Sequence, residues 1–138
     1  MKNKIIYKDL SYEIVGICFK LQDSLGRFCR EKQYSDEFEK QLIKGKIKYH
    51  REVFINEIKN TDVKGNKADF IIEDKVIVDF KAKKFITKED YYQMQRYLKF
   101  AELKLGLIIN LRETYLKPKR VINNEYDKDA SEVRGIRM

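Results

Sequence analysis

The chain has 138 residues, of which 43% are hydrophobic and 38% charged, with a formal net charge of +8. This length suits one domain with one core, while two cysteines and one histidine exclude a disulfide framework and a Cys/His zinc cluster. The apolar runs fall far short of the roughly 20 residues of a membrane span. We therefore expect a cytoplasmic protein without membrane association, with one domain over residues 1–123 and a polar, flexible tail over 124–138.

The positive charge favours a polyanionic partner, and nucleic acid above all. The lysines are scattered along the chain rather than gathered into a basic arm. A lysine-rich composition of the source proteome explains the charge equally well, so charge alone leaves the partner open.

Apolar residues at helical spacing predict three helices, over residues 11–23, 30–44 and 88–103. Ser11 is the expected N-cap of the first helix, and Gly45 ends the second. Thr87, with Asp90 three residues later, is expected to cap the third helix.

Short apolar segments between turn residues predict the strands, over residues 48–59, 66–72, 76–82, 105–111 and 119–122. The first strand is expected to place Tyr49, Val53 and Ile55 on one side. The segment over 105–111 is almost wholly apolar, which is typical of a strand buried on both faces.

The segment from Ala68 to Lys81 has a numerical pattern that predicts its hairpin register. Its apolar residues Ala68, Phe70, Ile72, Val76, Val78 and Phe80 are even-numbered, whereas Asp69, Asp79 and Lys81 are odd-numbered. Residues paired across two strands lie on the same face of the sheet. The even-numbered apolar residues of both strands therefore lie on one face only if the connecting loop has an odd number of residues. A three-residue loop over 73–75 does this and places Asp69 roughly opposite Asp79.

Two carboxylates this close repel each other, so either one is protonated or a cation lies between them. Oxygen ligands favour Mg²⁺ or Mn²⁺. Lys81 points to the same face as Asp79 because the two residues are two apart on a strand. The alternative is an exposed polar face on which Asp79 pairs with Lys81 or Lys67. Ile71 and Ile77 on this face favour a covered one.

Glu31 lies at the inner end of an apolar stripe formed by Tyr34, Phe38 and Leu42. A carboxylate in such a position is unusual. The first turn of a helix also favours an acid through the helix dipole, so this position has two explanations.

The hairpin resembles the motif of the PD-(D/E)xK nuclease superfamily, in which an Asp and a later Asp/Glu-x-Lys lie on adjacent strands. Here these are Asp69 and Asp79-Phe80-Lys81. Ala68 replaces the proline of the motif's name.

Five fragments over residues 10–122, in the correct order, resemble the small bacterial and archaeal GxxExxY family within that superfamily. They are Leu25-Gly26 with Glu31-x-x-Tyr34, Ala68-Asp69-Phe70, Val76 to Ala82, Gln93 to Lys99 (similar to "aQllnYLk") and Leu105 to Asn110. The departures are Arg27 and Phe28 in place of a Pro-Gly pair, and Asp79 in place of the usual Glu.

The resemblance implies an α/β (α+β) fold with a restriction-endonuclease-like core, a central mixed sheet of four to five strands flanked by helices. It implies metal-dependent phosphodiester hydrolysis in DNA or RNA, with Mg²⁺ (or Mn²⁺) held by Asp69, Asp79 and the Phe80 carbonyl. Glu31 would bind the metal directly or through a water, and Lys81 would orient the nucleophile or stabilise negative charge.

Gln95 is expected on the inward face of the third helix, between core residues Tyr91 and Leu98, with its amide at the site. Tyr34 is expected in the core, with its hydroxyl hydrogen-bonded, or as a support for Glu31. Four further lysines near the site in sequence could hold a nucleic-acid backbone, although solvated lysines explain them as well: Lys67, Lys83, Lys84 and Lys88.

Two functional alternatives stay open. A catalytically inactive domain could keep the fold and bind nucleic acid or a protein, and an incidental acidic pair could serve a small-molecule or structural role. The chain has little room for a separate recognition domain, so substrate specificity would need a homodimer or another partner.

Overall fold

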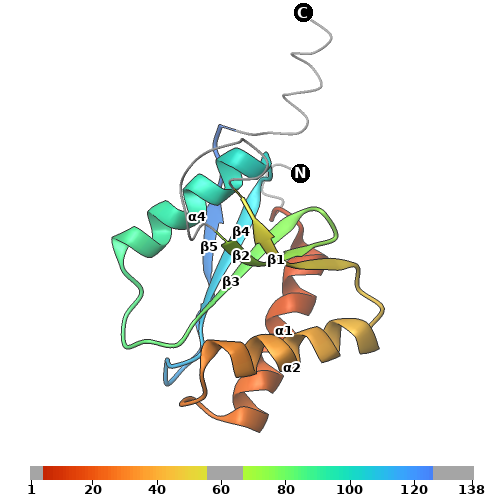
Figure 1. Cartoon of the computed structure of the whole chain (residues 1–138), viewed down its shortest axis with the longest axis vertical. Helices are drawn as coiled ribbons and strands as arrows, with labels where there is room; N and C mark the ends of the chain where they lie inside the picture. The colour runs from red at the N-terminus through yellow and green to blue at the C-terminus, as the bar shows by residue number, and fades with distance from the viewer. Residues whose placement is uncertain (1–4, 56–66, 126–138) are drawn as a thin grey trace, which may run out of the picture.

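The computed structural model of the chain describes residues 5–55 and 67–125. Within these ranges, a five-stranded sheet is flanked by three helices, α1 (Lys8–Leu25), α2 (Glu31–Lys44) and α4 (Lys88–Ala101) (Figure 1). The strands are β1 (Tyr49–Phe54), β2 (Lys67–Ile72), β3 (Val76–Lys81), β4 (Leu105–Asn110) and β5 (Lys119–Ile122). Over these two ranges, no helix has the length and apolar character needed to cross a bilayer.

The strands follow one another in the sheet in their chain order. β1, β2 and β3 are antiparallel neighbours, β3 and β4 run parallel, and β5 returns antiparallel to β4. The parallel pair needs a long crossover, and α4 provides it. The predicted mixed α/β sheet is therefore confirmed.

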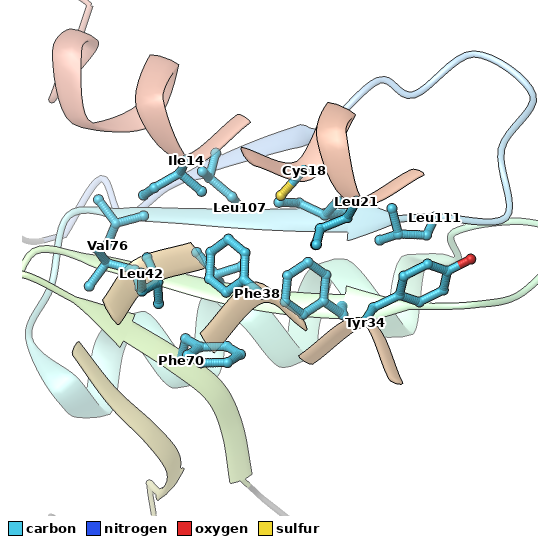
Figure 2. Packing of buried hydrophobic residues seen from close by; sticks show 14 of the residues in the cluster. Ile14, Cys18, Leu21, Tyr34, Phe38, Leu42, Phe70, Val76, Leu107 and Leu111 are labelled. Carbon is cyan, nitrogen blue, oxygen red and sulfur yellow. The ribbon is translucent and has the colours of Figure 1, made fainter. Parts of the chain in front are cut away.

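Two hydrophobic clusters cover the two faces of the sheet. One packs α1 and α2 against the sheet, with Phe38 in edge-to-face contact with Phe70 (Figure 2). Phe38 makes a second edge-to-face contact with Phe80. The other packs Met94 and Tyr97 of α4 against the opposite face. β4 lies between both clusters, which explains why its six residues are all buried.

The predicted register of the β2–β3 hairpin is confirmed. Ile72 pairs with Val76 and Phe70 with Val78, and the loop between the strands has three residues. The Lys75 amide donates to the Ile72 carbonyl at 2.9 Å. Residues 73 and 74 adopt the left-handed conformation, which closes this loop.

The side-chain alternation changes at Asp69, which the sequence pattern did not predict. Ala68 packs with the α4 cluster, whereas Phe70 packs with the α1/α2 cluster. Glu52, which faces Asp69 in the β1–β2 register, has a φ of 56° in place of the extended value. Val53 and Ile55 share a side as predicted, whereas the same irregularity places Tyr49 on the other side, so its assignment to their side is wrong.

Several element ends differ from the predictions. α1 begins at Lys8, so Ser11 is not the N-cap of this helix. The Ser11 hydroxyl instead donates to the Lys8 carbonyl within the helix. The strand predicted over 48–59 ends at Phe54, and residues 56–66 lie outside the described ranges. The predicted Thr87–Asp90 capping box of α4 is confirmed. Of the predicted tail over 124–138, the structure describes only residues 124 and 125.

Replacement of Gly106 by alanine is expected to destabilise the fold by about 1–3 kcal/mol. A Cβ atom there would overlap the Sδ atom of the buried Met94 and lie 2.6 Å from its Cγ atom. Urea denaturation measures the loss. Gly16→Ala is the matched control, because a Cβ on Gly16 has no neighbour within 4 Å, and alanine in a helix should gain about 0.5–1 kcal/mol. Equal stabilities for the two variants would contradict close packing of α4 on β4.

Candidate active site

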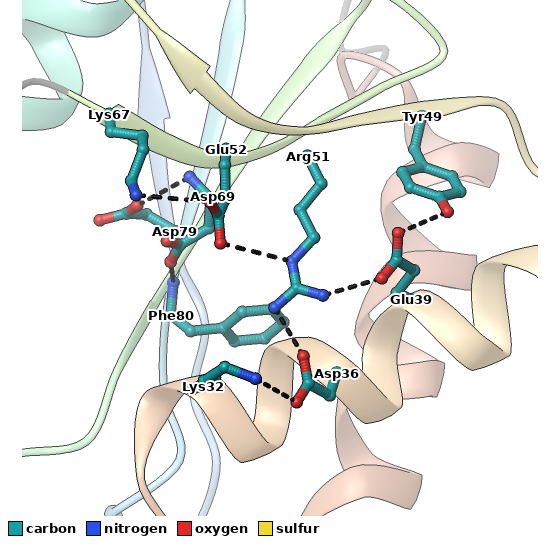
Figure 3. Close-up of polar contacts among 10 residues, drawn as sticks. All are labelled: Lys32, Asp36, Glu39, Tyr49, Arg51, Glu52, Lys67, Asp69, Asp79 and Phe80. Atoms are coloured by element: carbon teal, nitrogen blue, oxygen red, sulfur yellow. Dashed lines mark hydrogen bonds and ion pairs between the residues drawn. The ribbon is translucent and has the colours of Figure 1, made fainter.

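The carboxyl groups of Asp69 and Asp79 meet across the β2–β3 hairpin. The Asp69 amide donates to Asp79 Oδ1 at 3.4 Å, and the Phe80 amide donates to Asp69 Oδ2 at 2.7 Å (Figure 3). Each aspartate is thus tied to the backbone of the opposite strand, which holds the two carboxyl groups together.

Burial raises the pKa of Asp69 to about 7, and the nearby charge of Asp79 adds to this shift. The Phe80 amide opposes it by donating a hydrogen bond to the carboxylate, without offsetting the other two effects. A cation beside a buried carboxylate such as Asp69 stabilises its ionised form. The pair is therefore a place where positive charge is favoured.

Lys81 provides one such charge. Its Nζ atom lies 3.0 Å from Asp79 Oδ2 and 3.8 Å from Asp90 Oδ1, and it donates to Gln93 Oε1 at 3.2 Å. Burial alone would lower the pKa of Lys81, but the charges of Asp79 and Asp90 outweigh it and raise the pKa. The acidic neighbours of Lys81 therefore stabilise its positive charge.

These side chains line one open pocket of about 180 Å³. It receives residues from α2, from the β2–β3 hairpin and from α4: Glu31, Lys67, Asp69, Asp79, Phe80, Lys81, Gln93 and Tyr97. The Phe80 side chain belongs to the core, so this residue offers its backbone to the pocket. The hairpin acids, Lys81 and Glu31, predicted as one group, are thus brought together.

Two sets of contacts hold Glu31 at the pocket. The buried Tyr34 donates its hydroxyl to the Gly26 carbonyl and accepts from the Cys29 amide, which secures the turn before α2. Arg51 of β1 contacts Asp36 and Glu39 of α2, each at 2.8 Å (Figure 3). These contacts fasten α2 to the sheet, and they confirm Tyr34 as a core residue with a hydrogen-bonded hydroxyl.

The structure places Gln95 away from this pocket. Gln95 is exposed and lies beside Lys99 and Asn123, at the other side of α4. Tyr91, expected in the core, is 40% exposed, so the predicted inward face of the helix was wrong, although Leu98 is buried as expected. The inward face instead carries Met94, Tyr97 and Leu98.

Gln93 and Tyr97 are the site residues that the sequence reasoning missed. Tyr97 is buried and donates its hydroxyl to the Lys67 carbonyl at 3.3 Å. Gln93 and Tyr97 are four residues apart, so they lie on one side of α4. The same glutamine-to-tyrosine spacing occurs in the "aQllnYLk" pattern, and it was the signal that could have selected Gln93.

Asp90 was predicted as a cap and also contacts the site. Its carboxylate accepts from the Thr87 amide and lies 2.5 Å from Lys83 Nζ. Burial would raise the pKa of Asp90, but the hydrogen bonds from Lys83 and Thr87 outweigh it and lower the pKa. Asp90 is therefore a fixed negative charge that links the start of α4 to Lys81 and Lys83.

The four lysines predicted to hold a nucleic-acid backbone have different surroundings. Lys67 lines the pocket and lies 3.4 Å from Glu52, while Lys83 pairs with Asp90. Lys84 lies over the ring of Phe85 in a neighbouring pocket, and Lys88 is exposed at the start of α4.

The donor set fits a divalent metal ion in its chemistry. Asp69, Asp79 and the Phe80 carbonyl offer hard oxygen ligands of the kind that Mg²⁺ and Mn²⁺ prefer. Burial and the neighbouring charge of Asp79 raise the pKa of Asp69, so a cation bound at this pair would stabilise the ionised carboxylates. Within residues 5–55 and 67–125, no three acidic, histidine or cysteine side chains are close enough together to hold a metal ion. Glu31 therefore adds negative charge near Asp69 but does not complete a metal-binding cluster.

Comparison with known proteins agrees with this geometry. The family model described as the PD-(D/E)XK nuclease superfamily matches residues 8–122. A search of curated proteins found no match, and a search of solved structures also found none. The matched segment includes the five strands and three helices that the structure describes, and every residue that lines the pocket. The chain therefore belongs to the PD-(D/E)XK nuclease superfamily.

Proposed function

We propose that this chain is a metal-dependent nuclease that hydrolyses phosphodiester bonds in DNA or RNA, and that it belongs to the GxxExxY family within its superfamily. The observation that carries the proposal is the convergence of Asp69, Asp79, Lys81 and Glu31 on one pocket, from α2 and from both strands of the β2–β3 hairpin.

In the proposed site, Asp69, Asp79 and the Phe80 carbonyl would hold Mg²⁺ or Mn²⁺, and Glu31 would act directly or through a water. When bound, the metal supplies a Lewis acid for the phosphate and a water of lowered pKa. Lys81 stabilises the negative charge that develops on the phosphate, because its ammonium group is already positioned and protonated. Gln93 holds the Lys81 ammonium through its amide oxygen.

The net charge of +8 supports a polyanionic substrate. Lys67 is the basic residue best placed to contact a phosphate in the pocket, since it lines the pocket and its ion pair with Glu52 is long. Lys83 is less available, because Asp90 already neutralises it.

The test is an assay with end-labelled single- and double-stranded DNA and RNA, in Mg²⁺, in Mn²⁺ and in excess EDTA. We expect cleavage of at least one substrate with metal, none in EDTA, and none by Asp79→Asn. Asp74→Asn is the matched control: it removes an exposed aspartate from the loop of the same hairpin, and its cleavage should equal that of the unmodified chain. If no substrate is cleaved in a metal-dependent way, the nuclease assignment is wrong.

One observation favours the alternative of an inactive, nucleic-acid-binding domain. Glu31 is exposed and completes no acid cluster among the described residues. The same assay separates the two functions, because an inactive domain would bind the oligonucleotides in EDTA and leave them intact in Mg²⁺ and Mn²⁺.

A further inference from the structure

A second pocket lies at the same end of the sheet as the candidate active site. β3 and β4 are parallel, so the connections that follow them leave the sheet at one edge. The α1–α2 connection reaches the same end (Figure 1). Together the three connections form a pocket of about 440 Å³, whose lining includes Arg27, Lys84, Phe85, Arg112, Tyr115 and Lys117.

Two arginines at this pocket hold each other in place. The Nε atom of Arg27 donates to the Arg112 carbonyl, and the Nε atom of Arg112 donates to the Arg27 carbonyl, both at 2.9 Å. Both guanidinium carbons lie over the ring of Phe28, at 5.1 and 5.2 Å from its centroid. Each guanidinium is therefore oriented and keeps its terminal nitrogens for another partner.

In the part of the chain that the structure describes, no carboxylate lies within ion-pair distance of the basic side chains at this pocket, Arg27, Lys84, Arg112 and Lys117. Glu113 also lines the pocket, and its carboxylate accepts from the Lys117 amide at 3.2 Å. Four positive charges beside one negative charge repel one another, and a polyanion would relieve this repulsion.

Three aromatic side chains stand in solvent among these charges. Phe28 is 73% exposed, Phe85 69% and Tyr115 79%. Lys84 lies over the Phe85 ring, with its Nζ atom 5.7 Å from the centroid. Exposed aromatic faces beside cations are what unpaired bases and their phosphates need, whereas bases within a duplex are already stacked and hide their faces.

The second pocket is joined directly to the active-site pocket. Lys84 follows Lys81 by three residues, so their Cα atoms are at most roughly 11 Å apart. Asn110 fixes the two connections to each other, since its side chain donates to the Lys83 carbonyl at 2.8 Å and accepts from the Lys83 and Arg112 amides. A strand held in one pocket would therefore pass close to the other.

We propose that this basic and aromatic pocket binds an unpaired nucleic-acid strand and directs it to the active site, so that single-stranded DNA or RNA, or an unpaired end, is the preferred substrate. The inference rests on the proposed nuclease function for its biological meaning. Its physical content, which is binding to unpaired nucleotides through stacking and phosphate contacts, can be measured without cleavage.

The test measures affinity for fluorescent single-stranded oligonucleotides and for a duplex of matched length, in EDTA, so that no metal-dependent cleavage occurs. The unmodified chain should bind the single strands more tightly. Tyr115→Ala and Phe85→Ala should each weaken single-strand binding about 5- to 100-fold and change duplex binding little. Tyr12→Ala is the matched control, because Tyr12 is 82% exposed on α1, outside this pocket, and it should leave both affinities unchanged.

The salt dependence tests the phosphate contacts separately. Lys84→Ala and Lys117→Ala should each reduce the slope of log affinity against log salt by about 0.7, the value for one phosphate contact on a single strand. Lys40→Ala, on the exposed side of α2, should leave the slope unchanged.

The outcomes separate this inference from the proposed function. Unchanged single-strand affinity in Tyr115→Ala and Phe85→Ala, or tighter binding of duplex, would overturn the inference even if the chain cleaves nucleic acid. Single-strand binding that depends on these residues, without cleavage in Mg²⁺ or Mn²⁺, would support the inference and overturn the nuclease proposal. Failure of the unmodified chain to bind any oligonucleotide in EDTA would also overturn the inference.

Discussion

Replacement of Lys81 by methionine is expected to lower the rate of metal-dependent phosphodiester cleavage by about 10²- to 10⁴-fold. The ammonium group is held by Asp79 at 3.0 Å and by Gln93 at 3.2 Å, so its position is fixed before substrate binds. Methionine keeps most of the side-chain volume and removes the charge. The measurement is the single-turnover cleavage rate at saturating Mg²⁺, on the substrate that the unmodified chain cleaves best.

Lys75→Met is the control for this variant. Lys75 is an exposed lysine in the loop of the same hairpin, outside the residues that line the active-site pocket. We expect Lys75→Met to cleave at the rate of the unmodified chain. If Lys81→Met kept more than about a tenth of the activity, the chemistry would take place elsewhere or come from a contaminant.

Replacement of Asp69 by asparagine is expected to stabilise the metal-free protein at pH 8, by on the order of 2–4 kcal/mol. The pKa of Asp69 is about 7 in the folded chain, against an ordinary value of 3.8. The folded state therefore holds this proton more tightly than the unfolded state. Its contribution to the free energy of unfolding is complete below about pH 4 and is lost as the pH rises through 7. Asparagine has no proton to lose.

Urea denaturation in EDTA at pH 5 and pH 8 measures this difference. The unmodified chain should lose stability between the two values, and Asp69→Asn should lose much less. Among the residues that the structure describes, four other carboxyl groups have a lowered pKa, and their contributions are lost only as the pH falls below about 4: Asp36, Glu39, Asp74 and Asp90. The window from pH 5 to pH 8 lies above these four contributions, and parallel curves for the two proteins would show that the Asp69 carboxyl has an ordinary pKa.

Adding Mg²⁺ at pH 8 extends the same experiment. A metal that binds only the folded chain raises the free energy of unfolding with its concentration. We expect this gain in the unmodified chain, and a much smaller gain in Asp69→Asn. An equal gain in both proteins would place the bound metal away from the acid pair.

The hairpin shows how much local pattern can determine. Apolar residues at even positions on both strands, from Phe70 to Phe80, require an odd loop, and the structure has the predicted three-residue loop. The rule works because alternate side chains on a strand face opposite sides, so an error of one residue would move every apolar side chain to the other face of the sheet. The Thr87–Asp90 cap followed from equally local chemistry.

Local pattern failed where neighbours in space decide the outcome. On α4 the choice between Gln93 and Gln95 depends on which face meets the sheet, and the packing of Met94 against Gly106 sets that face. The change of alternation at Asp69 has the same origin, because it accompanies the left-handed backbone of Glu52 on the adjacent strand. In both cases, the residue that decides the outcome lies outside the segment whose structure it changes.

By itself, the sequence determined the order of helices and strands, the hairpin register and the placement of Asp69, Asp79 and Lys81 together. These features depend on alternation and capping over a few residues. Only the tertiary structure decided that Gln93, Tyr97 and Asp90 join them, and that Arg27, Phe85 and Tyr115 meet in a second pocket. Those groupings come from connections far apart in the chain, which are brought to one end of the sheet because β3 and β4 run parallel.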